Sequence, residues 1–360
     1  MSHQNRNYLN PNLFFLIEDG QIVGWDYKNH NQFVLEKEYF DRLVEISNID
    51  NTSSQRHSLD QELQDGQLIS SELPEQKWGW DVLSKIFHVG TQNIPVAHGT
   101  DTQESYVGDY IEFCEEHILN EPIKIEKGGN IVVLPEPDLA LLKGVDFWTT
   151  ISNRKTCRAF DGNPLDLHTL STLLFVSFGE IHGKWKELED LNLKDYGSRK
   201  ASPSGGALHP SEAYIVALNV NGLSAGIYHY RSHQHVLTQI SDKNLVEQMG
   251  ELLCGQHFAK QLSIGIFITS EFSKCWDKYP HSRAYRIALF DIGHLSQTFQ
   301  LTASALGIKS WLSGIFQDNE VNELLKIDGS TEHAMFFVGA GMGEDSSLDS
   351  VTKNIILNKK

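Results

Sequence analysis

The sequence lacks any apolar run approaching the about 20 residues that a helix needs to span a bilayer. Residues 1–12 are polar, and no apolar segment of the kind found in signal peptides comes after a basic start. We therefore expect a cytoplasmic protein without a membrane partner.

Positive charge is scarce. The chain has 30 Lys and Arg against 47 Asp and Glu, which gives a formal net charge of −17. An acidic protein of this kind repels nucleic acid and anionic membrane surfaces, so we expect neither as a partner. A ligand that carries a phosphate must instead be held by a local group of basic residues.

Cysteines are few, and their spacing is uninformative. Cys114, Cys157, Cys254 and Cys275 form no CxxC motif and no Cys/His pair at zinc spacing. We expect reduced thiols and no metal site. The sequence also has no GxGxxG motif before a helix and no Walker lysine, which argues against a Rossmann or P-loop nucleotide site.

The length of 360 residues suggests about two domains. The spacing of apolar residues predicts a small α/β module over residues 1–75. Its strands are expected at 13–17 and from Ile22, and its helix at 39–46. The polar stretch 48–66 is interpreted as a linker or a long mobile loop. The N-terminal module is therefore expected to be separate from residues 76–360.

Residues 76–145 are interpreted as a connecting segment, with an amphipathic helix at 78–87, a loop at 98–100 and a short strand at 131–134. The pattern then becomes more regular, and 146–360 are expected to form the catalytic domain. Apolar helices are predicted at 169–178 and 283–306, the second ended by Gly307, and strands at 213–219, 227–230, 262–269, 309–315 and 333–339. Helices and strands mixed in this order predict an α+β fold.

Three cations and a hydroxyl lie within five residues, namely Arg154, Lys155, Thr156 and Arg158. Arg and Lys bind phosphate through charge-assisted hydrogen bonds, and Arg can do so with two parallel bonds. The alternative is a solvated basic loop, since runs of charge are often simply exposed.

The segment Pro203, Ser204, Gly205 and Gly206 consists of small residues. Such residues let the backbone approach a planar ligand closely and present N–H groups to it. The alternative is an ordinary turn, because Pro, Ser and Gly all favour turns. A similar choice exists at Ser313 and Gly314, which either bring backbone close to a ligand or form a strand with a bulge.

Lys278 and Tyr279 lie between a predicted buried strand and a long helix, where α/β proteins often place functional loops. A lysine beside a tyrosine offers two groups for proton transfer. The alternative is an exposed loop before a helix. Arg283 and Arg286 fall early in that helix, where cations are unfavourable, which suggests an anionic partner for them.

Taken in order along the chain, these segments resemble the nitroreductase family. The resemblance runs from the cations after position 153, through the Pro203–Gly206 segment, to the predicted strands near 262, 311 and 333, and it covers roughly residues 78–343. Lys278 and Tyr279, with Arg283, Tyr285 and Arg286 after them, resemble the SagB/McbC-type azoline dehydrogenase branch, as do residues 85–88 with Thr91.

The resemblance implies a dimeric α+β fold with FMN bound at the subunit interface. It assigns the FMN phosphate and ribityl chain to Arg154, Lys155, Thr156 and Arg158, the isoalloxazine ring to Pro203, Ser204, Gly205 and Gly206, positions close to the flavin to Gln256, Ser313 and Gly314, and catalysis to Lys278 and Tyr279. The chain departs from the family at 341–350, which is acidic where nitroreductases commonly carry a basic phosphate ligand. Lys353 is the nearest basic residue.

The activity implied is FMN-dependent oxidation of thiazoline or oxazoline rings in a peptide to thiazole or oxazole, with dioxygen as electron acceptor and cyclodehydratase proteins as partners. The N-terminal module resembles winged-helix-like peptide-recognition modules, and the alternative is a structural extension. Two other functions stay open. One is an NAD(P)H-dependent nitro or quinone reductase, against which the Lys278–Tyr279 pair argues. The other is a non-catalytic scaffold subunit, which would have no need of a phosphate site.

Overall fold

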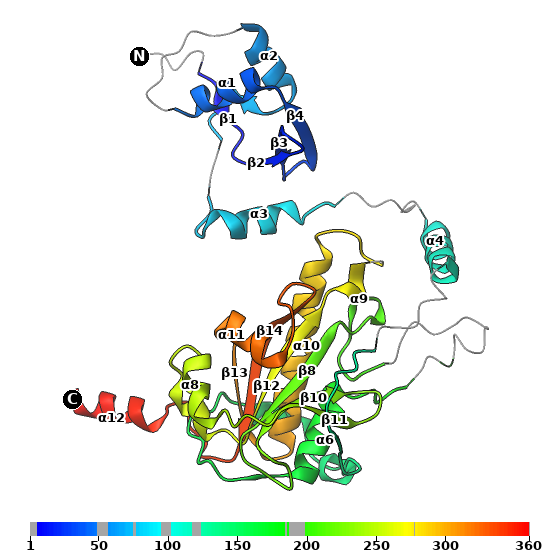
Figure 1. The fold of residues 1–360 in the computed structure, drawn as a ribbon, viewed down its shortest axis with the longest axis vertical. Helices are drawn as coiled ribbons and strands as arrows, with labels where there is room; N and C mark the ends of the chain where they lie inside the picture. The colour runs from blue at the N-terminus through cyan, green and yellow to red at the C-terminus, as the bar shows by residue number, and fades with distance from the viewer. Residues whose placement is uncertain are drawn as a thin grey trace. The chain divides into compact units, whose positions relative to one another are not determined.

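The structure is a computed structural model that describes residues 6–48, 57–74, 77–94, 102–116, 124–183, 186, 199–276 and 278–359 (Figure 1). Backbone contacts divide the chain into two compact units. The first unit is Met1–Ala97 with His281–Arg283, and the second is His98–Pro280 with Ala284–Lys360. Each unit has its own core.

The first unit contains a three-stranded antiparallel sheet of order β2-β3-β4 and a separate pair of β1 and β5. Its elements are β1 (Tyr8–Leu9), β2 (Leu13–Glu18), β3 (Gln21–Asp26), β4 (Asn31–Leu35), α1 (Lys37–Ser47), α2 (His57–Asp65), β5 (Ile69–Ser70) and α3 (Val82–Gly90). Leu35, Leu43, Leu63, Leu68 and Ile69 form the core. The two strands and the helix predicted before residue 47 are confirmed.

The prediction of a linker or mobile loop over 48–66 is wrong for its second half, where α2 forms. The segment has few large apolar residues, but Leu63 is 1% exposed and packs in the core. Asp60 is also buried, and it pairs with Arg42 of α1. Leu63 and this buried ion pair therefore hold α2 against the rest of the unit. Residues 49–56, and the loop predicted at 98–100, lie outside the described residues.

The second unit is built on a seven-stranded sheet of order β13-β14-β12-β8-β10-β11-β6, in which every neighbouring pair is antiparallel. The strands are β6 (Ile131–Val133), β8 (Ser211–Ala217), β10 (Gly226–Arg231), β11 (Val236–Ser241), β12 (Ile264–Glu271), β13 (Lys309–Ser313) and β14 (Glu332–Gly341). A short parallel pair, β7 (Leu165–Asp166) and β9 (Val220–Asn221), lies apart from this sheet.

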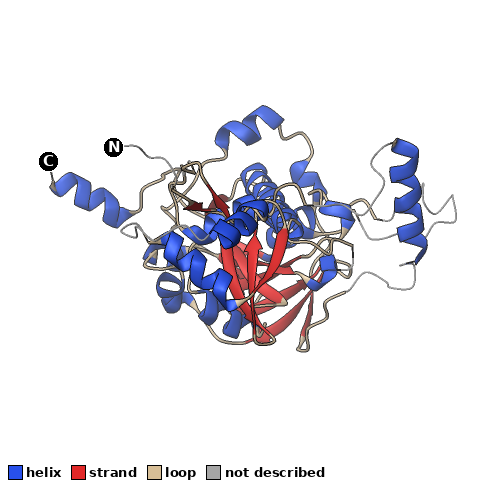
Figure 2. Cartoon of the chain, turned by 90° about the horizontal axis from the view of Figure 1, so that it is seen from above, coloured by secondary structure: helices blue, strands red, loops and turns tan. Residues whose placement is uncertain are grey.

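Both faces of this sheet are apolar, because alternate residues of β8 enter two different cores. Ala213 and Ile215 face the core formed with α6 (Leu167–Phe178) and α10 (Ala284–Ala305). Tyr214 and Val216 face the second core, which includes residues of α8 (Met249–Leu252) and α11 (Asp318–Leu325). Figure 2 shows the strands of this sheet in red, with helices beside them.

The remaining helices among the described residues of the second unit are α4 (Gln103–Glu116), η1 (Leu139–Leu142), α5 (Phe147–Asn153), η2 (Gly205–Ala207), η3 (Val246–Gln248), η4 (His257–Gln261), α9 (Ser273–Trp276) and α12 (Ser350–Asn358). The predicted helix over 283–306 is confirmed as α10, and Gly307 comes after it with a φ of +73°. The predicted strands of this domain are also confirmed, with bounds that differ by at most two residues. None of the described helices is long and apolar enough to cross a membrane.

Candidate functional site

Lys278 and Tyr279 lie directly against the glycine segment. The Nζ of Lys278 donates to the carbonyl oxygen of Gly206 at 3.3 Å. Gly206 has a φ of +60°, and a β-carbon there would lie 2.7 Å from the Tyr279 hydroxyl and 2.9 Å from the Lys278 Nζ. A β-carbon at Gly205 would lie 2.3 Å from the side chain of Ile287. Glycine is therefore needed at both positions if the pair is to approach this closely.

The glycine segment is tied to α10 through a buried carboxylate. Asp291 accepts hydrogen bonds from the Ser204 hydroxyl at 2.5 Å and from the Gly205 N–H at 3.3 Å. The Ser204 oxygen also accepts from the N–H of His209 at 2.9 Å. Burial raises the pKa of Asp291, and the hydrogen bonds from Ser204 and Gly205 oppose that rise. Pro203 lines a small cavity beside Asp291, together with Lys200 and Ser202.

The short helix α9, which precedes Lys278, is held by an ion pair whose side chains are 9% and 13% exposed. Lys274 Nζ lies 2.5 Å from one carboxylate oxygen of Glu212, and His229 Nε2 lies 3.0 Å from the other. Burial alone would raise the pKa of Glu212, but the charges of Lys274 and His229 outweigh it and lower the pKa to about 2. The N–H of Tyr279 bonds to the Cys275 carbonyl at 2.8 Å. The ion pair thus binds α9 to β8, and Lys278 and Tyr279 come shortly after the end of α9.

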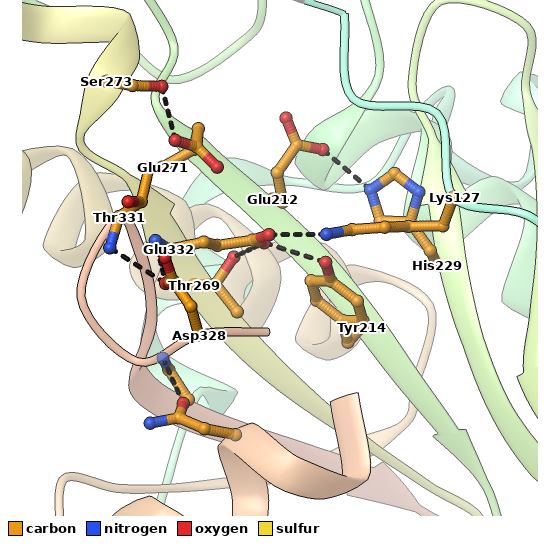
Figure 3. Close-up of polar contacts among 12 residues, drawn as sticks. Lys127, Glu212, Tyr214, His229, Thr269, Glu271, Ser273, Asp328, Thr331 and Glu332 are labelled. Atoms are coloured by element: carbon orange, nitrogen blue, oxygen red, sulfur yellow. Dashed lines mark hydrogen bonds and ion pairs between the residues drawn. The ribbon is translucent and has the colours of Figure 1, made fainter. Parts of the chain in front are cut away.

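A second carboxylate, that of Glu332, accepts hydrogen bonds from three donors. Figure 3 shows Lys127, Tyr214 and Thr269 converging on Glu332, each at 2.8 Å from a carboxylate oxygen. Burial, with the Glu332 charge adding to it, raises the pKa of Tyr214 well above its usual range. Together with Glu212 and His229, also drawn in Figure 3, this cluster forms a polar end to an otherwise apolar sheet.

Arg154 and Lys155 line an open pocket whose other walls come from α10 and β13. Lys309 and Ser310 of β13 also line it, as does Asp345. Asp345 Oδ2 lies 3.1 Å from Lys155 Nζ, and its Oδ1 lies 3.8 Å from Lys309 Nζ. The hydrogen bond from Lys155 and the charge of Lys309 lower the pKa of Asp345. We refer to this group of Arg154, Lys155, Lys309, Ser310 and Asp345 as the cation pocket.

The other two residues of the predicted phosphate motif have different surroundings. Thr156 forms a bridge with Ser310, so its backbone runs along the edge of β13. Arg158 donates to the carbonyl of Ser347 at 3.0 Å. Lys353, the basic residue nearest to the acidic segment, lies 3.6 Å from Glu344.

Gln256 and Ser313 are brought together at the far end of β13. The side-chain amide of Gln256 donates to the Ser313 hydroxyl at 3.1 Å. Gly314 comes directly after Ser313 and is exposed. β13 thus carries Lys309 of the cation pocket at its start and Ser313 at its end.

Within one chain, α10 separates the cation pocket from the glycine segment. Arg154 contacts Gln300 at 3.4 Å, whereas Ser204 contacts Asp291 and Ser202 contacts Thr298 at 2.7 Å. Asp291 and Gln300 are nine residues apart on this helix, which corresponds to about 13 Å along its axis and about half a turn around it. The two groups therefore approach α10 from opposite sides.

The residues of these clusters that were not predicted from the sequence include Asp291, Lys309, Glu212 and Lys274. Asp291 lies within an apolar helix, and a charged residue on a helix face that is otherwise buried is a signal that could have identified it. Lys309 begins a strand, and only the fold places it beside Lys155. Arg283, for which an anionic partner was expected, donates to the carbonyl of Thr91 at 3.2 Å. Among the described side chains, no group of three or more His, Cys, Asp or Glu residues is placed to hold a metal ion.

Residues 151–342 match the model of the nitroreductase family. A solved structure of a nitroreductase-type protein from Anabaena variabilis has a TM-score of 0.50 and 26% sequence identity, covering 77% of this chain and 50% of that one. The expected α+β nitroreductase-like fold is therefore confirmed.

Curated relatives fall into two groups. MJ1384 of Methanocaldococcus jannaschii, named as a nitroreductase, is 28% identical over 199 residues, which is 55% of this chain and 92% of that protein. The trifolitoxin-processing protein TfxB of Rhizobium leguminosarum bv. trifolii is 32% identical over 141 residues, 38% of each chain. The microcin B17-processing protein McbC of Escherichia coli is 30% identical over 183 residues, 48% of this chain and 60% of that protein. The chain thus spans less than two thirds of the length of either processing protein. The similarity to these two proteins confirms the resemblance to the SagB/McbC-type branch.

Proposed function

Because this chain belongs to the nitroreductase family, we propose that it is an FMN-dependent oxidoreductase that oxidises thiazoline or oxazoline rings of a peptide to thiazole or oxazole. The observation that carries the proposal is the close approach of Lys278 and Tyr279 to the glycine segment, which puts two proton-transfer groups beside Gly206. The similarity to two peptide-processing proteins supports a peptide as substrate.

The residues of the cation pocket fit the phosphate of FMN. Arg154, Lys155 and Lys309 against Asp345 leave an excess of two positive charges, which matches a phosphate dianion. Under the proposal, Arg154, Lys155, Thr156 and Arg158 hold the phosphate and ribityl chain. Pro203, Ser204, Gly205 and Gly206 line the ring, with Gln256, Ser313 and Gly314 close to it.

Oxidation of an azoline removes two hydrogens from adjacent ring carbons. The neutral amine of Lys278 accepts the proton from one of these carbons, while its N–H bond to Gly206 holds the nitrogen in place. Tyr279 assists because its hydroxyl lies beside the same glycine. When bound, FMN supplies the acceptor for the hydride that leaves the other carbon, with dioxygen as the terminal electron acceptor.

We further propose that two copies share each FMN, because the cation pocket and the glycine segment lie on opposite sides of α10. The exposed face of α10 includes Tyr285, Leu289 and Phe290, and α5 exposes Phe147 and Trp148. Apolar side chains exposed along two helices are typical of a surface covered by another protein. A second copy covering this face would bring its own glycine segment toward the cation pocket. We also propose that cyclodehydratase proteins are partners of this chain and that its N-terminal module binds peptide.

The absorbance spectrum of the purified protein, followed by mass analysis of an azoline peptide incubated with it, tests this function. We expect flavin bands and a loss of two hydrogens from the peptide. A matched peptide whose rings are already azoles should keep its mass. A yellow protein that leaves every azoline peptide unchanged would contradict the proposal.

The second candidate is an NAD(P)H-dependent nitro or quinone reductase, which the similarity to MJ1384 favours. Adding NADPH and a nitroarene to the yellow protein separates the two. Rapid bleaching with turnover would favour the reductase. A colourless protein that binds peptide would instead indicate a non-catalytic scaffold subunit.

A further inference from the structure

We infer that Asp291 is a positioning residue for Lys278, acting through the loop of residues 204–209. The inference rests on the proposed function, since it concerns how the lysine is made ready to accept a proton. Asp291 is 4% exposed, lies on α10, and has no part in the chemistry proposed above.

Asp291 holds the loop at its beginning and, indirectly, at its end. One carboxylate oxygen accepts from the Ser204 hydroxyl at 2.5 Å and the other from the Gly205 N–H at 3.3 Å. Ser204 in turn accepts from the N–H of His209 at 2.9 Å. A chain of hydrogen bonds therefore runs from the helix to both ends of the loop.

The loop between these ends has a backbone that requires such support. Gly206, Ala207 and His209 have φ values of +60°, +56° and +45°. Two of these residues are not glycine, and non-glycine residues in the left-handed region persist only where the surroundings hold them there. Without Asp291, we expect the loop to relax toward more ordinary backbone angles.

Relaxation of the loop would affect Lys278, because its Nζ donates to the carbonyl of Gly206 within the loop. If Gly206 moves, the amine loses this acceptor and its fixed direction. Charged or titratable groups around Asp291 are His294 on the same helix, Lys200 and His209 in the adjoining cavity, and Cys275 and Tyr279 after β12. Burial raises the pKa of Asp291, so the carboxylate needs its two donors to remain charged.

The test is competitive labelling of lysines in the FMN-loaded protein with trace acetic anhydride, read by mass spectrometry. Lys243, which is exposed, serves as the internal reference. We expect the labelling of Lys278 relative to Lys243 to rise about fivefold in Asp291→Ala, the factor for one net hydrogen bond of about 1 kcal/mol. Asp291→Asn should give a smaller rise, because its amide oxygen can still accept from Gly205.

Two further variants separate positioning from general loosening. Ser204→Ala removes the same hydrogen bond from the other side and should give a similar rise, and the double variant should rise no further. Ser296→Ala, which removes a bond to the Gly293 carbonyl on the same helix, should leave the ratio unchanged. An unchanged ratio in both Asp291→Ala and Ser204→Ala would overturn the inference.

Azole formation gives the second readout. Asp291→Ala should lower kcat with little change in KM, and should add no further loss when Lys278 is already alanine. A further loss in that background would show that Asp291 acts elsewhere. If the wild type oxidises no azoline while the labelling ratio still rises, the proposed function fails and the link from Asp291 to Lys278 stands.

Discussion

The side-chain nitrogen of Lys278 lies 3.3 Å from the carbonyl oxygen of Gly206, 72 residues earlier in the chain. The contact joins the end of α9 to the loop before β8. It gives Lys278 a fixed direction, because a backbone carbonyl cannot rotate away as a side chain can.

The first prediction concerns Lys278 itself. Lys278→Ala should keep the fold and bound FMN but lose azole formation, because the proposed mechanism gives the ring proton to Lys278. General-base catalysis contributes about 100- to 10,000-fold, and we expect a loss in that range. The rate of mass loss from an azoline peptide measures it, and flavin absorbance confirms retention of FMN. Azole formation at near the wild-type rate would show that the role given to Lys278 is wrong.

The second prediction concerns Gly206, which lies against Lys278 and Tyr279. Gly206→Ala should cost about 1 kcal/mol of stability for its left-handed backbone, and it should also displace Tyr279 and Lys278. A displacement of about 1 Å can lower a rate by about 100-fold. Thermal unfolding and azole formation measure the two effects separately.

Gly144→Ala is the matched control for this change. Gly144 has a φ of +81°, and a β-carbon there meets nothing within 4 Å. The control should lose similar stability and keep its activity. Equal activity in both alanine variants would mean that the close approach at Gly206 is unimportant.

Much of the fold could be predicted because its elements have local sequence patterns. The periodicity of α10, with Gly307 after it, indicates a long helix, and the apolar runs of β8 and β12 indicate buried strands. α2 could not be predicted in this way. Its stability comes from a buried ion pair with Arg42 and from one leucine, and neither gives a pattern within the segment.

The candidate site was only partly visible in the sequence. Arg154, Lys155, Lys278 and Gly206 stand out as residue types, but the partners that hold them come from distant elements. Asp291 is 13 residues after Lys278, and Lys309 is far from Lys155, so no short motif contains either pair. Only the folded chain brings these partners to the residues that the motifs contain.

The third prediction concerns the cation pocket. Arg154→Ala should weaken FMN binding by about 10- to 100-fold, because a hydrogen bond between charged groups contributes about 1.5–3 kcal/mol. Asp345→Asn should instead strengthen FMN binding, since it releases Lys155 and Lys309 for the phosphate. Quenching of FMN fluorescence on titration with the apoprotein at low salt measures both. Weaker binding in Asp345→Asn would contradict the phosphate assignment.

The fourth prediction is a pH dependence at Glu212. Its pKa falls from 4.5 to about 2, as the charges of Lys274 and His229 outweigh the effect of burial. A lowered pKa in the folded state means that the stabilisation is fully present above pH 4.5 and is lost as pH falls toward 2. At neutral pH it amounts to roughly 3 kcal/mol.

Urea unfolding of wild type and Glu212→Gln across this range measures the effect. The difference in stability should be largest at pH 7 and should shrink between pH 4.5 and 2. Glu247→Gln, which removes an exposed carboxylate, should show a small difference at every pH. A Glu212→Gln difference that stays constant with pH would mean that the carboxylate charge is not what stabilises this end of β8.

The fifth prediction concerns the ion pair that holds α2. Arg42 and Asp60 form two hydrogen bonds, at 2.7 and 2.9 Å, with both side chains buried. Asp60→Ala leaves a buried guanidinium without this partner, and such changes cost roughly 3–5 kcal/mol. Hydrogen exchange of the full chain should therefore quicken in β2, β3 and β4.

Exchange in β8 and β12 should stay as slow as in the wild type, because those strands belong to the core of the second unit. Gln61→Ala on the same helix is the control, since Gln61 is exposed and its side-chain amide donates to Asp65, one turn further along the helix. Faster exchange in both variants would mean that α2 is loosely held and that the buried pair contributes little. Faster exchange in β8 after Asp60→Ala would mean that the two units unfold together, which their separate cores argue against.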